Sequence, residues 1–455
     1  MRHFTPPFTL KYIESLLFKA KYHTILFDCL TANARWEAVL IDIIKWKPDI
    51  IIILSSIHGK TMALELSSFL KKKSDVFTVA IGAGPTHNPN EYIFVNSPVD
   101  VIIKGEPEIE VAYLIDQLNK DVGRENIRRI YRERITKNEI LVDNLNSLPF
   151  PKYNYNEIIA YRFLYPIRIA KKLKWGHILS SRGCWHKCSF CSQVIRESYG
   201  KSVRFRSAVN VVNEIEYLMI MGVNIVAFDD DDFTLSIKHV EGICLEIIER
   251  GLNIKWIAHS RVDEVKFSLM KLMKEAGCVL LKFGIESGSQ RIIDILDKNT
   301  YNLDWIKTSY NAFHYARKID IATCALFIIG NPTETEQEVK NTIKLARKLK
   351  PDFIQIHFFT IYPGSIIYER FKNELTVDKL SAMYHYCLPE LNVSSIQAIK
   401  LLKIRAYFYK KLFLNPSFII EHFLKYILFY LCNINVASLL SQRFKFQKCS
   451  RRAKA

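Results

Sequence analysis

The sequence predicts an α/β protein made of two successive parallel β-sheets, followed by a helical region. Short runs of apolar and β-branched residues recur along residues 23–115 and again along residues 176–370, and segments with helical spacing separate them. Several of these runs are wholly apolar, as is typical of strands that a parallel sheet buries on both faces. Regular alternation of strands and helices favours doubly wound or barrel-like sheets.

The first sheet is expected in residues 1–117, as a doubly wound domain. Its predicted strands are His23–Asp28, Asp49–Ser55, Phe77–Ile81 and Val99–Ile103, and its predicted helices include Trp36–Lys47 and Thr61–Lys73. Glycine-containing turns follow the last three strands, at Ser55–Gly59, Gly82–His87 and Gly105–Glu108. Because ligands of such sheets lie outside the carboxyl ends of the strands, these turns are the candidate binding site of the domain.

Residues 118–175 are basic and less regular, and we expect them to link the two sheets. Leu145–Pro151 is predicted to be extended, because proline lacks a backbone donor and restricts the residue before it.

The second sheet is expected in residues 176–370. Its six predicted strands are His177–Ser181, Asn224–Phe228, Ile254–His259, Val279–Gly284, Ala322–Ile329 and Phe353–Phe359. Six strand–helix units in one run favour a parallel, barrel-like sheet, a partial (β/α)6 barrel. The functional residues of such barrels lie at the C-terminal ends of the strands.

Residues 371–455 are expected to be helical, aromatic and basic. Their most apolar segment, Pro416–Leu440, is interrupted by acidic and basic side chains. Its uninterrupted part, Tyr426–Cys432, is far shorter than the ~20 residues that a bilayer-spanning helix needs. We expect the region to pack onto the barrel. The alternative is peripheral docking onto a membrane surface, helped by the basic tail.

Composition and charge limit the class of protein. The chain has 455 residues, of which 49% are hydrophobic and 24% charged, as in a globular protein of two or three domains. The ten cysteines show no disulfide framework, and residues 1–22 lack the features of a signal peptide, so a reducing, cytoplasmic location is expected. The net charge of +18 reflects a Lys-rich composition, and we do not expect nucleic acid as a partner.

Three cysteines follow the first predicted strand of the second sheet. Cys184, Cys188 and Cys191 have the spacing C-x3-C-x2-C, and the next cysteine is Cys244. Three thiolates this close can hold three irons of a [4Fe–4S] cluster and leave the fourth iron open to an outside ligand. The alternative is a zinc knuckle with His186 as fourth ligand, but this histidine lies inside the loop.

This loop, with Phe190 before its last cysteine, resembles the cluster loop of the radical S-adenosylmethionine (SAM) enzymes. The resemblance implies that the open iron binds SAM, and that an electron from the cluster splits SAM into methionine and a 5′-deoxyadenosyl radical. The turns after the later strands also resemble those of the family. They comprise Asp229–Thr234 (a "DD-F-T" turn), Arg261–Asp263 (an "R-x-D" turn), Phe283–Ser289, Phe327–Thr335 and Ile361–Ser365.

The resemblance implies SAM contacts by residues of the loop and these turns, namely Phe190, Asp230, Arg261, Glu286, Ser287 and Gly330. Each has a structural alternative. The acidic run could be a solvated turn or helix cap. Arg261 could meet a carboxylate through its forked donors or form a surface ion pair, and Glu286 could belong to a capping box around Ser287.

The first sheet resembles the cobalamin-binding domain of the B12-binding radical SAM family. The resemblance implies that cobalamin lies on the strand ends, with contacts from Ser55, Gly82, Gly84 and Gly105. The chain departs from the family because an opening strand is missing or shortened, the cobalt-ligating "D-x-H-x-x-G" motif is absent and one glycine is Ala83. The alternative is a Rossmann-like domain that docks on the barrel and binds no corrinoid.

The resemblance therefore implies an enzyme that methylates or otherwise modifies an unactivated carbon of a small-molecule or lipid-like substrate, reduced by a donor such as flavodoxin or ferredoxin. Oxidative cyclisation or rearrangement uses the same parts. An RNA-modifying methylthiotransferase would need three amino-terminal cysteines, and only Cys29 precedes Cys184. A non-enzymatic electron carrier would have no use for the SAM-type turns. His58 and His87 are candidate cobalt-side or substrate residues, with polar loop residues as the alternative.

Overall fold

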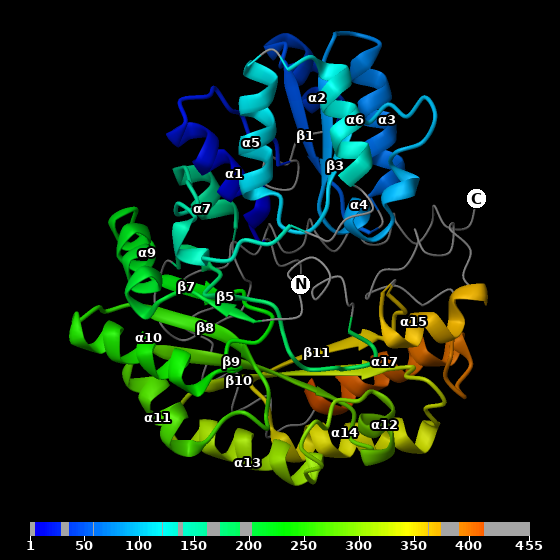
Figure 1. Ribbon diagram of the computed structural model, residues 1–455. Helices are drawn as coiled ribbons and strands as arrows, with labels where there is room; N and C mark the ends of the chain where they lie inside the picture. The colour runs from blue at the N-terminus through cyan, green and yellow to red at the C-terminus, as the bar shows by residue number, and fades with distance from the viewer. Residues whose placement is uncertain are drawn as a thin grey trace.

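The computed structural model describes residues 5–28, 36–57, 59–120, 122–134, 140–161, 173–191, 203–362, 364–374 and 391–413. The described chain forms a three-stranded and a six-stranded parallel sheet, and Figure 1 shows the smaller sheet with its helices above the larger one. This confirms an α/β fold with two parallel sheets.

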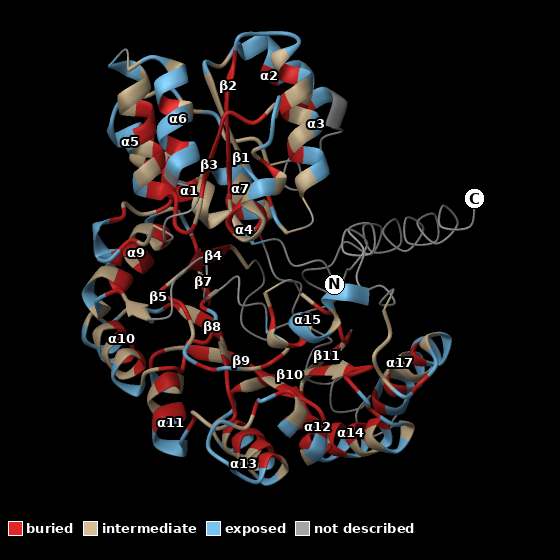
Figure 2. Ribbon diagram, turned by 45° about the vertical axis from the view of Figure 1, so that its right-hand side comes forward, coloured by how far each residue is buried: buried red, intermediate tan, exposed pale blue. Residues whose placement is uncertain are grey.

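The N-terminal sheet has the strand order β1 (Ile50–Leu54), β2 (Phe77–Ile81) and β3 (Val101–Ile103), all parallel. Its helices are α1 (Phe8–Lys19), α2 (Trp36–Trp46), α3 (Lys60–Lys71), α4 (Ala83–His87), the 3-10 turn η1 (Pro89–Glu91), α5 (Glu108–Asn119) and α6 (Arg124–Arg134). Figure 2 shows α5 and α6 on one side of the sheet and α2 and α3 on the other. All residues of the middle strand β2 are buried.

Two expectations about the N-terminal half were wrong. His23–Asp28, predicted as a strand, forms no strand in the structure. Leu145–Ser147, the start of the segment predicted to be extended, forms the short 3-10 turn η2. The less regular stretch expected at residues 118–175 also contains α6 and α7 (Tyr155–Ala160). Ile127 and Tyr131, one helical turn apart on α6, are buried in the core of the N-terminal sheet. Asn154 caps α7 through a capping box with Glu157.

The larger sheet confirms the six predicted parallel strands. Its order is β11-β10-β9-β8-β7-β4, and the strands are β4 (Trp175–Ile178), β7 (Ile225–Phe228), β8 (Lys255–Ser260), β9 (Cys278–Glu286), β10 (Ala322–Ile329) and β11 (Phe353–Phe358). The connecting helices are α9 (Ala208–Ile220), α10 (Ile237–Glu249), α11 (Phe267–Glu275), α12 (Gln290–Ile295), α13 (Trp305–Lys318) and α14 (Glu336–Leu349). A small antiparallel pair, β5 (Ser181–Arg182) and β6 (Arg204–Phe205), lies between β4 and α9.

Side chains alternate between two cores along these strands. The larger core lies between the sheet and its outer helices and includes the fully buried Trp256 and Trp305. The smaller one lies on the opposite face and includes Trp175, Ile257 and Leu280. This alternation with period two is what a sheet buried on both faces requires.

The described C-terminal elements are α15 (Ile366–Phe371), η3 (Lys372–Glu374) and α17 (Ala398–Phe413). Leu401 and Phe408 of α17 are fully buried in the main core of the barrel, and the Phe408 ring lies 5.6 Å from that of Phe327. The apolar segment Pro416–Leu440 lies outside the described residues, so its docking stays a prediction. Within the described ranges, no helix combines the length and apolarity needed to cross a membrane.

Candidate active site

The three cysteines lie on a loop that begins at the carboxyl end of the first barrel strand. Ser189, between the second and third cysteines, anchors this loop through its backbone and its hydroxyl. Its N–H donates to Leu296 O at 2.9 Å and its Oγ to Ile295 O at 2.9 Å, while the N–H of Ile367 donates to its carbonyl at 3.1 Å. The loop is therefore fixed to the end of α12 and the start of α15, on the far side of the barrel from β4.

The loop presents three sulfurs within eight residues of chain. The N–H of Cys191 donates to Cys188 O at 3.1 Å, which forms a tight turn between these two cysteines. Burial raises the pKa of the Cys184 thiol to about 12. This thiol therefore needs a cation beside it to become the thiolate that ligates iron.

The acidic run at the end of β7 holds the segment that leads into this loop. Asp229 lies 2.6 Å from His177 Nδ1. Asp230 accepts from the hydroxyls of Ser180 and Ser181, both at 2.9 Å, and from the Ser181 N–H at 2.5 Å. Burial raises the pKa of Asp230 to about 7. Asp230 is thus neither solvated nor a helix cap: it is buried and positions the chain three residues before Cys184, whereas Asp231 next to it is exposed.

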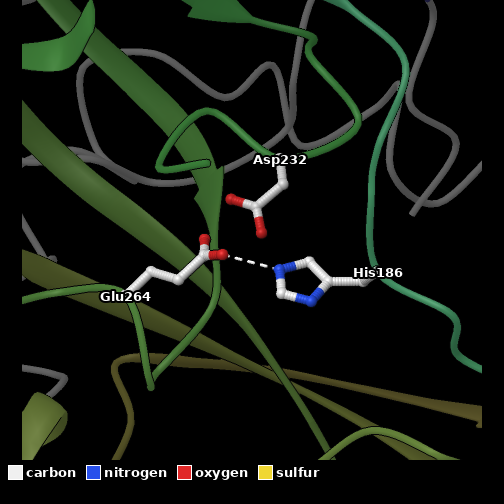
Figure 3. A group of neighbouring side chains, drawn as sticks. All are labelled: His186, Asp232 and Glu264. Atoms are coloured by element: carbon white, nitrogen blue, oxygen red, sulfur yellow. Dashed lines mark hydrogen bonds and ion pairs between the residues drawn. The ribbon is translucent and has the colours of Figure 1, made fainter. Parts of the chain in front are cut away.

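His186, which lies inside the cluster loop, forms a group with Asp232 and Glu264 (Figure 3). His186 Nε2 lies 2.6 Å from Glu264 Oε1, and His186 Nδ1 lies 3.0 Å from Thr300 Oγ1. Burial lowers the pKa of His186 to about 4 and raises that of Asp232 to about 8. His186 is thus held by Glu264 and Thr300, which counts against its role as fourth ligand of a zinc knuckle.

The ligand atoms of this group lie within 4.8 Å of one another, so the three side chains could also hold a divalent cation. Sequence reasoning did not single out Glu264. Its position directly after the "R-x-D" turn was the available signal, but nothing local indicated that it meets His186, 78 residues earlier.

Arg261 is buried and directed toward the cluster loop. It donates to both carboxylate oxygens of Asp263, at 2.9 and 2.7 Å, and to the carbonyl of Lys298 at 2.6 Å. A further donor, Nη1, lies 3.6 Å from Cys188 Sγ. Its fork is therefore taken by Asp263 rather than open to a ligand carboxylate, and the ion pair is buried, not on the surface as the alternative expected.

Glu286 lies on the same side of the barrel and has a left-handed backbone, with φ of 63°. Its carboxylate accepts from Lys298 Nζ at 3.0 Å, and that ammonium lies 6.0 Å from the centre of the Phe190 ring. The group thus brings Glu286, Lys298 and the cluster loop together. Sequence reasoning missed Lys298, which follows α12 in a stretch without a motif.

Ser287 and Gly330 have structural contacts. Ser287 is fully buried, lies 3.3 Å from Thr342 Oγ1 and accepts from Ser289 N–H at 3.2 Å. The residue before α12 is Ser289, so the capping box expected around Ser287 is absent there. Gly330 has a φ of 82° and donates its N–H to Glu334 at 2.7 Å, in a turn that packs against α17.

The carboxyl end of the N-terminal sheet borders a cavity of about 1120 Å³. Ser55, Gly82 and Gly105 line it, whereas Gly84 does not. Gly84 instead lies under the Tyr92 hydroxyl, where an added Cβ would be 2.3 Å from that oxygen. Three of the four expected corrinoid contacts therefore line the same cavity, whereas Gly84 allows close packing against Tyr92.

The two candidate histidines of this domain have different outcomes. The His87 ring packs against the turn after β11, where an added Cβ at Gly364 would lie 2.5 Å from the ring. This places the end of α4 against the barrel. His58 lies outside the described residues.

Four charged side chains, three of them buried, join the two sheets. Glu108 accepts from Arg182 at 2.8 Å, and Glu106 accepts from Arg204 at 2.8 Å and lies 3.4 Å from Arg182. The exposed fraction is 0% for the Glu106 side chain and 1% for that of Glu108. Arg182 stands two residues before Cys184, so this cluster ties the β3 turn of the N-terminal sheet to the start of the cluster loop.

Comparison with known proteins bears on the whole chain. Residues 178–346 match the Radical SAM superfamily. An uncharacterized methyltransferase of Pyrococcus horikoshii is 30% identical over 427 residues, which cover 91% of this chain and 89% of the relative. The anaerobic magnesium-protoporphyrin IX monomethyl ester cyclase of Rubrivivax gelatinosus is 25% identical over 436 residues, 92% of this chain and 76% of the relative.

Two solved structures share the fold. One is the radical SAM methyltransferase TsrM from Kitasatospora setae with cobalamin and a [4Fe–4S] cluster bound, with a TM-score of 0.65 at 16% identity over 81% of this chain and 75% of that one. The other is the cobalamin-dependent SAM radical enzyme OxsB with aqua-cobalamin bound, with a TM-score of 0.59 at 14% identity over 88% of this chain and 58% of that one.

The relative from Pyrococcus horikoshii extends over 91% of the chain, so the similarity includes both sheets and not the barrel alone. Together with the position of the three cysteines at the carboxyl end of β4, it confirms the resemblance seen in the sequence: the chain belongs to the radical SAM superfamily of enzymes and has the fold of its cobalamin-dependent members.

Proposed function

We propose that this enzyme uses a [4Fe–4S] cluster, SAM and cobalamin to methylate an unactivated carbon of a small-molecule or lipid-like substrate. One observation carries the proposal: the cluster loop at the carboxyl end of the barrel is tied by buried ion pairs to the carboxyl end of the N-terminal sheet. The candidate cluster site and the candidate corrinoid site therefore belong to one connected interior.

The cysteine loop fits a [4Fe–4S] cluster. It offers three sulfur donors at C-x3-C-x2-C spacing, and Glu264 and Thr300 hold His186, the one fourth ligand that the sequence suggested. Arg261 Nη1 is directed at Cys188 Sγ, and the Lys298 ammonium lies beside Phe190. Cations near the sulfurs stabilise the negative charge of a thiolate-ligated cluster.

The N-terminal cavity fits part of a corrinoid. Its lining includes Ser55, Gly82 and Gly105 at the carboxyl edge, where ligands of doubly wound sheets lie. Glycines there allow a ligand to approach the backbone closely. The proposal assigns no cobalt ligand.

When bound, these cofactors supply one-electron cleavage of SAM and delivery of a methyl group to a carbon radical. The protein's own residues hold and shield the reacting parts. Asp230 and Ser189 fix the two ends of the cluster loop. Phe190 packs with Phe359 and Ile361, which covers one side of the loop with apolar side chains. The Glu286–Lys298 pair places a carboxylate next to the loop, where it can accept from ribose hydroxyls or the ammonium group of SAM.

A second candidate function is oxidative cyclisation. The 25% identity to the magnesium-protoporphyrin ester cyclase over 92% of this chain favours it, since that protein shares both halves. Labelled SAM separates the two: a methyltransferase transfers the labelled methyl group to its product, and a cyclase does not. An RNA-modifying activity has less support, because one cysteine alone precedes Cys184 in the sequence.

The proposed partners are a small-molecule or lipid-like substrate and an electron donor such as flavodoxin or ferredoxin. The proposed location is cytoplasmic, with a peripheral membrane contact as the variant. Flotation with anionic vesicles tests that variant, and failure to float removes it.

The test of the proposed function is the iron and cobalt content of the chain after anaerobic reconstitution with iron, sulfide and hydroxocobalamin. We expect about four irons and about one cobalt per chain. Cys188→Ala should lose the iron and keep the cobalt. The matched control is Cys244→Ala, since Cys244 is buried in α10, away from the loop. Iron without cobalt would remove cobalamin from the proposal, and iron that survives Cys188→Ala would overturn the assignment of the loop.

A further inference from the structure

Three possible metal ligands meet at the carboxyl ends of three neighbouring strands, β4, β7 and β8. His186 comes from the loop after β4, Asp232 from the turn after β7 and Glu264 from the turn after β8. The strands are parallel, so their carboxyl ends lie at one edge of the sheet and bring the three turns together. One nitrogen or oxygen atom of each side chain lies within 4.8 Å of the other two, and Figure 3 shows the three groups facing one another.

The three side chains are shielded from water. The exposed fraction is 2% for the His186 side chain, 7% for that of Glu264 and 4% for Asp232. Two carboxylates buried next to each other cost free energy unless a proton or a cation lies between them. The contacts of the group indicate which of the two is expected.

The surrounding protein offers too few hydrogen-bond donors for two carboxylates. Asp232 Oδ1 accepts from the N–H and the hydroxyl of Thr234, at 3.0 and 2.8 Å. The same hydroxyl has a single hydrogen, yet it also lies 3.2 Å from Glu264 Oε2 and 2.9 Å from Ser260 Oγ. Asp232 Oδ2 has no hydrogen-bond partner among the described residues. A buried oxygen without a donor calls for a bound water or ion.

The neighbouring basic side chains pair with other carboxylates. Arg261 pairs with Asp263 at 2.7 Å, and Lys298 pairs with Glu286 at 3.0 Å. Within the described part of the chain, no lysine or arginine forms an ion pair with the two carboxylates of the group. The cysteine thiolates that ligate a cluster add negative charge close by. A divalent cation would offset the two carboxylates.

We propose that His186 Nε2, Asp232 Oδ2 and Glu264 Oε1 bind one divalent first-row transition-metal ion, separate from the iron–sulfur cluster. An imidazole together with carboxylates suits ions such as Mn²⁺, Fe²⁺ and Zn²⁺. Thr300 Oγ1, 3.0 Å from His186 Nδ1, accepts the N–H of the ring and so directs the Nε2 lone pair at the ion. Ligands that lie about 2.1 Å from one ion are about 3 Å or more apart, so Nε2 and Oε1, at 2.6 Å, separate slightly when it binds.

The ion would fix the cluster loop to the barrel at a further point. Ser189 already ties the loop to the end of α12, and Asp230 holds the segment before it. His186 lies between Cys184 and Cys188, so an ion on its ring holds the stretch that separates these two cysteines. The site lies outside the N-terminal cavity and needs neither SAM nor cobalamin.

The experiment uses Mn²⁺ alone as the probe. The full chain, without an affinity tag, is reconstituted with its cluster, passed over a chelating resin to remove other metal and titrated with Mn²⁺. The electron paramagnetic resonance signal of aqueous Mn²⁺ counts the free ion, and iron is measured in the same sample. We expect about one tightly bound Mn²⁺ per chain beside about four irons. Pulsed resonance should show a coupling between the bound Mn²⁺ and an imidazole nitrogen.

Two variants test the carboxylate ligands. Asp232→Asn and Glu264→Gln keep the size of each side chain and remove its charge. Each should weaken Mn²⁺ binding by more than the about tenfold that loss of an outer partner costs. The matched control is Glu275→Gln, which changes an exposed glutamate at the end of α11 and should leave the affinity unchanged.

The other outcomes overturn the proposal. A wild-type chain that binds no Mn²⁺ would mean that the two carboxylates share a proton instead. Bound Mn²⁺ without the nitrogen coupling, or with the same affinity in Asp232→Asn and Glu264→Gln, would be an adventitious ion elsewhere. The iron content separates this result from failure of the proposed function, because absence of the cluster is seen independently of Mn²⁺. If both variants also lose iron, the nitrogen coupling in the wild-type chain decides.

Discussion

The two sheets of this protein hold their candidate sites in different ways. Around the cluster loop, polar side chains are buried against one another: Asp230 against Ser180 and Ser181, and Arg261 against Asp263. At the N-terminal sheet the site borders a large apolar cavity beside a half-exposed strand. Hydrogen bonds within the protein thus fix the shape of the barrel site, whereas the N-terminal site is an apolar space whose walls need a ligand to contact.

The difference has a physical cause. A loop that holds an iron–sulfur cluster must keep three sulfurs in fixed positions, and buried hydrogen bonds are directional enough to do that. A large organic cofactor is held mainly by shape and apolar contact, which needs space instead. A cluster of ion pairs connects the two candidate sites. Its glutamates, Glu106 and Glu108, follow β3 of the N-terminal sheet, and its arginines, Arg182 and Arg204, belong to β5 and β6 next to the cluster loop.

The largest predicted effect comes from Arg182→Ala, which removes the ion pairs between the N-terminal sheet and the cluster loop. It leaves Glu108 and part of Glu106 as buried carboxylates without their cation, and removal of one partner of a buried ion pair typically costs about 3–5 kcal/mol. We expect this loss in the free energy of unfolding, measured by denaturant titration. Lys372→Ala removes a surface ion pair with Glu369 and should leave stability nearly unchanged. Equal losses in both variants would contradict the special role of the buried cluster.

A second prediction concerns the pH dependence of the barrel. Glu334 is fully buried beneath the β10 turn, and burial raises its pKa from 4.5 to about 7. The folded state therefore keeps a proton that the unfolded state loses, so this residue lowers stability progressively as pH rises from about 4.5 to about 7. Glu334→Gln should remove this slope and raise the free energy of unfolding above pH 7 by on the order of 2–3 kcal/mol.

Unfolding curves at pH 5 and pH 8 check this prediction. Glu336→Gln, an exposed change two residues away, is the control and should keep the wild-type slope. If Glu334→Gln stabilises the protein equally at both pH values, the effect comes from packing and not from ionisation.

A third prediction concerns the carboxyl edge of the N-terminal sheet. Gly82 has a φ of 98°, and an added Cβ would lie 2.7 Å from Leu54 Cδ1 and 2.9 Å from Ser55 O. Gly82→Ala should cost about 1–3 kcal/mol and push Leu54 and Ser55 away, which lowers the cobalt content. Gly251→Ala is the matched control, because it also has positive φ but no atom within 4 Å of the added Cβ. A cobalt loss equal in both variants would argue against a corrinoid at this edge.

Sequence patterns predicted the barrel better than the N-terminal domain. All six barrel strands were expected because apolar runs alternate with segments of helical spacing throughout this region, and each of these runs pairs with a neighbouring strand in the sheet, so local signal and tertiary pairing agree. The segment His23–Asp28 has the same local signal but no strand beside it in the described structure. α6 was missed because its residues, RENIRRIYRER, are mostly charged and only Ile127 and Tyr131 enter the core.

Sequence patterns also predicted only part of the candidate active site. The three cysteines lie within eight residues and were found from spacing alone. The ion pairs that hold their loop were not, because Glu108 and Arg182 are 74 residues apart, and Lys298 meets Glu286 across a helix. Pairing between distant charged residues leaves no pattern in one sequence. Arg261 and Asp230 were both expected to contact SAM. In the structure, Arg261 donates to Asp263, and Asp230 accepts from Ser181.

The smallest predicted effect concerns two helix N-caps, one in the barrel and one in the segment that joins the two sheets. Thr335 caps α14 in the barrel through a capping box with Glu338, and Asn154 caps the short α7 outside it in the same way with Glu157. Loss of a cap typically costs about 1 kcal/mol. The α14 box also engages Arg291, which donates to Glu338. Thr335→Ala should therefore leave Glu338 partly held and cost less than Asn154→Ala, as measured by thermal unfolding. A larger loss of stability in Thr335→Ala than in Asn154→Ala would contradict this prediction, because it would mean that Arg291 does not compensate for the lost cap of α14.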